Sequence, residues 1–203
     1  MVQKIRWAFL LVLCFAFADL DSAPASSKSL KTWKAGLAKV VITPEKPIWM
    51  SGYASRTKPS EGKIHDLYAK ALALEDPAGG RMVLVTTDLV GLSRSLADEV
   101  ALGVKKNSGL PRERLLLTSS HTHTGPVIRD SLITMYDLKP EQAEVVKHYS
   151  DKLAEQLIAL VGQALEDLSA AKISYGTGQA DFAVNRRVAS PTGFRIGVNP
   201  EGP

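Results

Sequence analysis

The chain has 203 residues, of which 45% are hydrophobic and 23% are charged, a composition that is typical of a globular protein and argues against intrinsic disorder. Its net charge of +4 falls to +2 without Lys4 and Arg6, which lie in an N-terminal segment that we expect to be removed. With no basic stripe and no interleaved aromatic and basic residues, the sequence predicts no nucleic-acid partner.

The N-terminus has the pattern of a secretory signal peptide. Lys4 and Arg6 precede an apolar run from Trp7 to Phe17, and the small residues of Ala16-Phe17-Ala18 suit a cleavage site. This run of 11 residues is shorter than the roughly 20 that a membrane-spanning helix needs. We therefore expect a signal peptide over residues 1–18, with an uncleaved anchor as the alternative.

The segment after the signal peptide is expected to be a flexible leader. Residues 19–34 are rich in Ser, Ala and Lys and show no apolar periodicity. The only cysteine, Cys14, lies inside the signal peptide, so the mature chain needs no disulfide for export. We expect a secreted or periplasmic protein, or one at the extracellular membrane surface, whose folded part starts near Ala35.

Three strands are expected before the first helix. A β-branched run over 36–43, ended by a proline, predicts the first strand, and a loop with several prolines follows over 44–62. The runs 67–75 and 82–87 predict two more strands, and the Pro- and Gly-containing residues 76–80 between them are typical of a hairpin turn.

An amphipathic helix is expected next, with Ser93 as its N-cap, an apolar face at Leu96, Val100 and Val104, and an end at Gly109.

A strand over 115–118 and a longer helix after Pro140 complete the main pattern. The helix is expected to turn these residues inward: Val145, Leu153, Leu157, Leu160, Val161, Leu165 and Leu168. The runs 172–178, 182–188 and 194–198 predict further short strands. The β-β-β-α-β-α-β order predicts an α/β fold, a mixed β-sheet with flanking helices.

A His-x-His pair follows the strand at 115–118. Alternate residues of a strand point to the same face, so His121 and His123 can present both imidazoles to one pocket. The hydroxyl residues around them can supply hydrogen bonds to metal-binding side chains. A catalytic zinc takes three protein ligands and a water, so this pair cannot complete the site. Two polar residues at a strand end are the alternative.

Four other residues carry candidate chemistry. His148 lies in the long helix and is expected to be solvated, and His65 is expected to make a structural hydrogen bond to Asp66. Asp88 either orients a site residue or caps the next turn. Arg186 suits a polar or anionic group because its guanidinium is a planar fork of donors, with plain surface charge as the alternative.

Several stretches, in order along the chain, match a known pattern; they are 35–44, 50–54, 64–71, 85–91, 121–126 and 184–186. In these stretches the sequence resembles the N-terminal catalytic part of the neutral/alkaline, non-lysosomal ceramidases. That resemblance implies a zinc amidase that splits the N-acyl bond of ceramide into fatty acid and sphingosine. Its expected cofactor is Zn²⁺, and its expected partner is ceramide or a related N-acyl lipid, with contact to a membrane surface.

The resemblance also implies roles for individual residues. His121 matches a zinc ligand, His123 matches the histidine that works on the scissile amide, and Arg186 matches an arginine facing the substrate's polar head. The family's other ligands, a histidine, a glutamate and a tyrosine, and its active-site serine lie beyond residue 203. We therefore expect residues 35–203 to be the N-terminal part of a catalytic domain, inactive by itself.

The sequence departs from the family pattern at Thr124, where serine is usual, and over 127–139, so the lipid specificity is open. Two rival functions are kept. One is a barrel-type metal-dependent amidohydrolase, which also uses His-x-His. The other is a non-catalytic exported module that binds lipid or a partner through Trp49 and Tyr53.

Overall fold

The computed structural model describes residues 32–198, so the expected signal peptide and most of the leader lie outside the described residues. The elements are β1 (Lys34–Val41), β2 (Tyr68–Glu75), β3 (Arg81–Thr87), α1 (Arg94–Ser108), β4 (Leu115–Ser119), α2 (Pro140–Glu166), β5 (Ser169–Ala170), β6 (Arg187–Ser190) and β7 (Gly193–Ile196). Two 3-10 helices cover Arg112–Arg114 and Ile133–Met135. Neither α-helix of the described part is both long enough and apolar enough to span a membrane.

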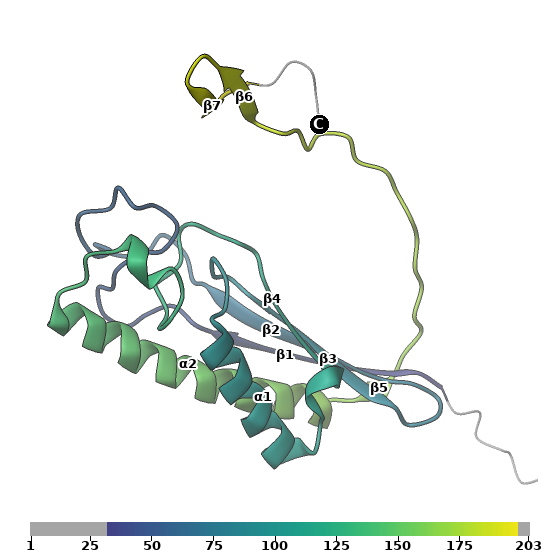
Figure 1. Cartoon of the computed structure of the whole chain (residues 1–203). Helices are drawn as coiled ribbons and strands as arrows, with labels where there is room; N and C mark the ends of the chain where they lie inside the picture. Colours follow the sequence, from purple (N-terminus) through teal and green to yellow (C-terminus); the bar gives the residue numbers. More distant parts are fainter. Residues whose placement is uncertain (1–31, 199–203) are drawn as a thin grey trace, which may run out of the picture. The chain divides into compact units, whose positions relative to one another are not determined.

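Five strands form one mixed sheet in the order β4-β3-β2-β1-β5 (Figure 1). β1, β2 and β3 are antiparallel neighbours. The expected turn joins β2 to β3, and in it Asp76 Oδ1 accepts from the amides of Ala78 and Gly80 at 2.7 and 2.9 Å. β3 and β4 are parallel, which requires a crossover, and α1 provides it. The expected mixed sheet with helices is confirmed.

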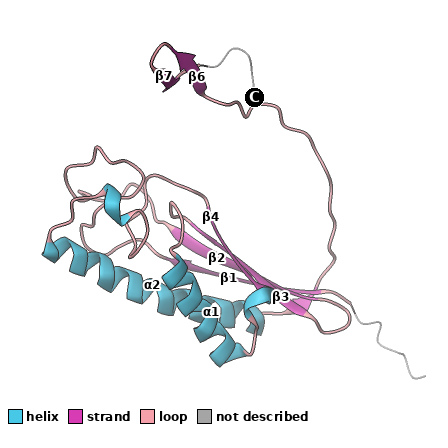
Figure 2. Cartoon of the chain, in the orientation of Figure 1, coloured by secondary structure: helices cyan, strands magenta, loops and turns pink. Residues whose placement is uncertain are grey.

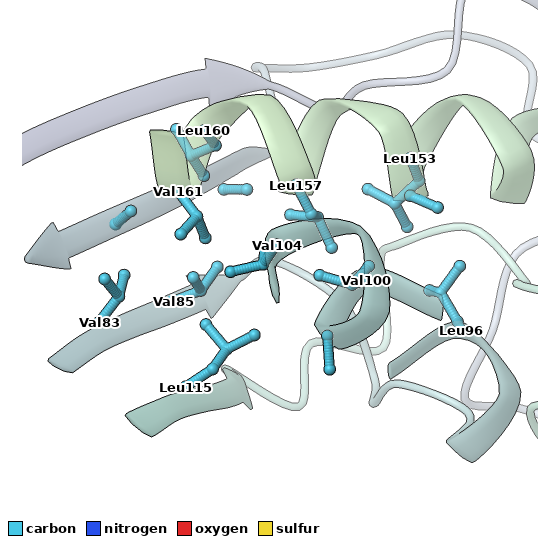
Figure 3. Close-up of a cluster of buried hydrophobic side chains, with 14 of the residues drawn as sticks. Val83, Val85, Leu96, Val100, Val104, Leu115, Leu153, Leu157, Leu160 and Val161 are labelled. Atoms are coloured by element: carbon cyan, nitrogen blue, oxygen red, sulfur yellow. The ribbon is translucent and has the colours of Figure 1, made fainter. Parts of the chain in front are cut away.

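Both helices cover the same face of the sheet (Figure 2). The inward positions of β2 are alanines, Ala69, Ala71 and Ala73, and these small side chains let α2 approach the strand closely. Val83 and Val85 of β3 continue this buried face. Figure 3 shows the resulting core, in which valines of the sheet meet leucines of the helices. Burying each such leucine contributes about 1.5–3 kcal/mol.

The helix ends follow the local signals in the sequence. The Ser93 side chain accepts from the Leu96 amide, and Gly109 ends α1 with a φ of 71°, the left-handed conformation that favours glycine. Pro140 stands at the first position of α2, where its missing amide hydrogen costs nothing.

The inward face of α2 differs from the expected one at its start. Val146 is buried and Val145 is exposed. One turn further along, the inward position is occupied by the buried Ser150 and not by an apolar residue. The Ser150 hydroxyl lies 2.6 Å from the Val146 carbonyl and accepts from the Arg129 amide at 2.9 Å. Because a polar residue occupies this inward position, the apolar residues alone did not indicate which face of the helix is buried here.

The C-terminal strands also differ from the expected ones. Residues 172–178 form no strand, and 182–188 contribute only Arg187 and Val188 to β6, which pairs with β7 in a separate hairpin. A strand needs a neighbouring strand for its backbone hydrogen bonds. On the edge of β1 that faces away from β2, the described residues pair only at Lys34 and Ala35, with β5, so residues 172–178 do not join the sheet there.

The sheet face away from the helices carries a row of leucines. The strand register aligns Leu37, Leu72, Leu84 and Leu116 across four strands. Leu37 is 67% exposed and Leu116 is 51% exposed. Surface leucines in a row are unusual for a solvated sheet face, since alternation normally places polar residues there.

Candidate functional site

Two loops at one end of the sheet form the candidate site. Residues 42–67 follow β1 and residues 120–139 follow β4, and these two strands run in the same direction, so their carboxyl ends lie at the same edge. An isolated antiparallel bridge joins Met50 to Pro126, with backbone hydrogen bonds on both sides of it. The tertiary pairing of two loops therefore builds the site.

A small apolar cluster packs against the first loop, residues 42–67. Trp49 is only 7% exposed and packs there with Ile48, Val127, Tyr136 and Val146. The Tyr136 hydroxyl also accepts from the Gly52 amide at 2.8 Å and lies 3.1 Å from Ser51 Oγ. The Trp49 indole is thus a core group and is not presented at the surface as a lipid-binding module would require.

The His-x-His pair lies in a turn and not on a strand. β4 ends at Ser119, so the expected alternation of strand residues does not apply to His121 and His123. His121 has a φ of 58°, a left-handed conformation that is uncommon outside glycine and concentrates at functional sites. The two ring centroids nevertheless lie 5.0 Å apart, with the ring planes at 70°. The turn brings the imidazoles together by a different route.

The hydrogen bond of His121 determines which ring nitrogen is free. Nδ1 lies 2.7 Å from the carbonyl oxygen of Val90, in the loop after β3. A carbonyl only accepts, so Nδ1 carries the proton and Nε2 of the neutral ring keeps its lone pair. Metal-binding histidines typically have this arrangement, with the second nitrogen donating to a carbonyl or carboxylate.

The donor set fits zinc in part. His121 offers a correctly oriented imidazole nitrogen, which is a preferred zinc donor. Within residues 32–198, however, no group of three His, Cys, Asp or Glu side chains is gathered closely enough to hold a metal ion. Among the described residues, His121 is thus a single candidate donor and not a complete metal site.

Gly52 makes room for the His123 ring. A Cβ on this glycine would lie 2.5 Å from Cγ and 2.8 Å from Nδ1 of His123, and its φ of 102° disfavours other residues. The Tyr53 ring meets His123 edge-on, with centroids 4.8 Å apart. His123 is therefore enclosed by the first loop on one side and faces His121 on the other.

Arg186 is described only within its own hairpin. It lies directly before β6, is exposed, and its Nε donates to the Gly197 carbonyl at 3.4 Å. The structure thus brings His121 and His123 together but records no contact of Arg186 with them among the described residues.

The remaining candidates have structural surroundings. Asp88 accepts from the Tyr68 amide at 2.9 Å and so closes the end of the β2–β3 pair. His65 is exposed and its Nδ1 lies 3.0 Å from the Asp66 backbone carbonyl, and His148 is exposed on α2.

Sequence reasoning missed Val90, Gly52 and Tyr136. The first acts through its backbone carbonyl, so its side chain gave no signal. The glycine stands among aromatic residues, a usable hint of a close approach. The tyrosine lies in the poorly matching segment 127–139, where its role depends on a contact 84 residues away in sequence.

Three comparisons with known proteins show what this chain is similar to. Residues 33–200 match the family model described as neutral/alkaline non-lysosomal ceramidase, N-terminal. Neutral ceramidase of Pseudomonas aeruginosa is 28% identical over 98% of this chain and 31% of its own length. Two solved structures, one of neutral ceramidase from Pseudomonas aeruginosa and one of a ceramidase complexed with C2, have TM-scores of 0.56 at 24% identity. Each alignment covers 68% of this chain and 22% of the other, so this chain spans under a third of these relatives.

Proposed function

Because the chain belongs to the neutral/alkaline non-lysosomal ceramidase family, we propose that it carries part of the active site of a zinc-dependent amidase. The substrate class is ceramide or a related N-acyl lipid, and the products are the fatty acid and the sphingoid amine. The observation that carries the proposal is the hydrogen bond from His121 Nδ1 to the Val90 carbonyl, which directs the free Nε2 for metal binding.

The residues of this chain divide the work. His121 would hold the metal, and a bound zinc would supply Lewis-acid chemistry that polarises the amide carbonyl and activates a water. His123 transfers a proton to the leaving amine, a task that imidazole side chains commonly perform in enzymes. Arg186 binds the polar head of the lipid through its fork of donors.

We propose that the remaining zinc ligands lie outside residues 32–198, since a catalytic zinc takes three protein ligands and this part supplies one. The 203-residue chain alone is then expected to bind zinc weakly and to show no turnover of a ceramide. Turnover of a ceramide by this chain with one zinc bound per molecule would contradict the proposal that its zinc site is incomplete.

Zinc titration of the purified chain tests the ligand assignment. His121→Ala removes the proposed donor and is expected to weaken zinc binding at least tenfold, the lower effect known for disturbing a metal site's supporting shell. His148→Ala removes an exposed histidine of α2 and serves as the matched control, with no change expected. Equal zinc affinity of His121→Ala and the parent chain would refute the assignment.

Export is part of the same proposal, because a lipid amidase of this class has to reach its substrate at a membrane surface. Expression of the full chain with its first 18 residues is expected to yield a mature product that starts after Ala18. N-terminal sequencing of the exported protein checks this, and a product that retains Met1 would speak for the uncleaved anchor.

A further inference from the structure

Arg56 is the residue of the first loop that contacts the backbone of the His-x-His turn. Its Nη2 donates to the His123 carbonyl at 2.6 Å. Its guanidinium also lies 5.4 Å from the Tyr53 ring centroid, and that ring in turn meets the imidazole of His123 edge-on. Arg56 therefore contacts His123 twice, directly at the backbone and through an aromatic ring at the side chain.

These contacts hold His123 from three directions. The carbonyl hydrogen bond fixes the peptide that follows the residue, the Tyr53 ring limits rotation of the imidazole, and Gly52 lies against Cβ and Cγ. The fourth side of the ring faces His121. The orientation of the imidazole toward the proposed metal ligand is thus set by the first loop and not by its own turn.

The surroundings of Arg56 do not suit a residue kept for stability alone. Its Nε is buried and has no hydrogen-bond partner within residues 32–198, and an unpaired buried donor lowers stability. Lys58, two residues further along the same loop, differs from Arg56 because its side chain is exposed and forms an ion pair with the exposed Glu61.

We propose that Arg56 is the positioning residue for His123. It clamps the His123 carbonyl and the Tyr53 ring, so that the imidazole stays directed at the substrate side of His121. The proposal rests on the amidase function above, and it adds a residue that neither the strand pattern nor the His-x-His motif indicated.

Proton–carbon NMR spectra of the histidine rings in the full 203-residue chain, recorded at one fixed pH, test the proposal. The chain has four histidines, and His123→Asn identifies the His123 signal by its loss. Arg56→Ala is expected to shift and broaden the His123 ring signals, while those of His65 and His148 stay in place. Arg56→Lys keeps one donor for the carbonyl and is expected to restore part of the parent position. Lys58→Ala, the matched control, is expected to leave all four histidines unchanged.

The outcomes separate positioning from a general structural role. Unchanged His123 signals in Arg56→Ala would overturn the proposal, and so would a shift of all four histidines together. If Arg56→Ala fails to fold, Arg56→Met decides, because it keeps an unbranched side chain but removes every donor, and an intact fold with an unshifted His123 again overturns the proposal. The zinc titration of His121→Ala stays an independent result, so failure of the amidase proposal is recognised separately.

Discussion

At Gly36 in β1, the backbone at the end of α2 lies very close to the sheet. A Cβ at this position would lie 2.1 Å from the Ala164 carbonyl oxygen and 2.9 Å from the Leu168 amide nitrogen. Both neighbours are backbone atoms, so no change of rotamer relieves the overlap. Gly36→Ala therefore has to push the C-terminal end of α2 away from β1.

The size of the effect follows from that displacement. Ordinary contact begins at 3.4 Å, so the helix end has to move by about 1 Å. A gap of this size loses a quarter to a half of the dispersion energy of the contacts it opens, and overpacking costs about 1–3 kcal/mol. The same displacement would weaken the hydrogen bond from the Leu37 amide to Asp167 Oδ2, which is 2.8 Å long in the parent protein. Bonds to charged groups contribute about 1.5–3 kcal/mol, so we expect a loss of roughly 2–5 kcal/mol.

Urea unfolding followed by circular dichroism measures this loss as a lower midpoint. The control is Gly162→Ala in α2, where, apart from the adjacent residues and the helix's own backbone, no described atom lies within 4 Å of the added Cβ. Because alanine favours a helix over glycine by about 0.8–1.0 kcal/mol, this control is expected to raise stability. A Gly36→Ala variant that unfolds within 0.5 kcal/mol of the parent would refute the close packing of α2 on β1.

Three further outcomes are expected from packing and charge. Leu157→Ala removes a fully buried side chain from the helix–sheet core and should lower the free energy of unfolding by about 2–5 kcal/mol in urea titrations. Burial raises the pKa of Tyr149, whose hydroxyl donates to the Ile42 carbonyl at 2.7 Å, so ultraviolet titration should show one tyrosine that does not ionise before alkaline unfolding. The Lys147 ammonium lowers the pKa of Asp151, so the pair stabilises the fold above the carboxyl's ordinary pKa of about 3.9 and loses this contribution as pH falls below it. Asp151→Asn should flatten the stability profile in that acid range and leave it unchanged in slope near neutrality, and an unaltered acid limb would contradict the pairing.

Local signals were enough for most elements of the sheet and for α1. The hairpin turn at 76–80, the Ser93 cap and the Gly109 end all depend on residues within a few positions of one another, so the sequence carries the whole argument. The predicted inward face of α2 was wrong by one residue at its start, because Ser150 is buried there and accepts a hydrogen bond from a residue 21 positions away. The expected strand at 172–178 was wrong because a strand forms only where the folded chain brings a pairing partner alongside, and no local pattern reports whether it does.

By itself, the sequence determined the mixed α/β architecture, the family, and the histidines that carry the proposed chemistry. These depend on periodicity, on turn residues and on a short motif, all of which are local in the chain. Only the tertiary structure decided how His121 and His123 are held. The free Nε2 of His121 depends on a carbonyl 31 positions away, and the orientation of His123 depends on Arg56, 67 positions away. Such contacts involve backbone atoms and loops that meet only when the strands align. No pattern of neighbouring residues in the sequence therefore indicates them.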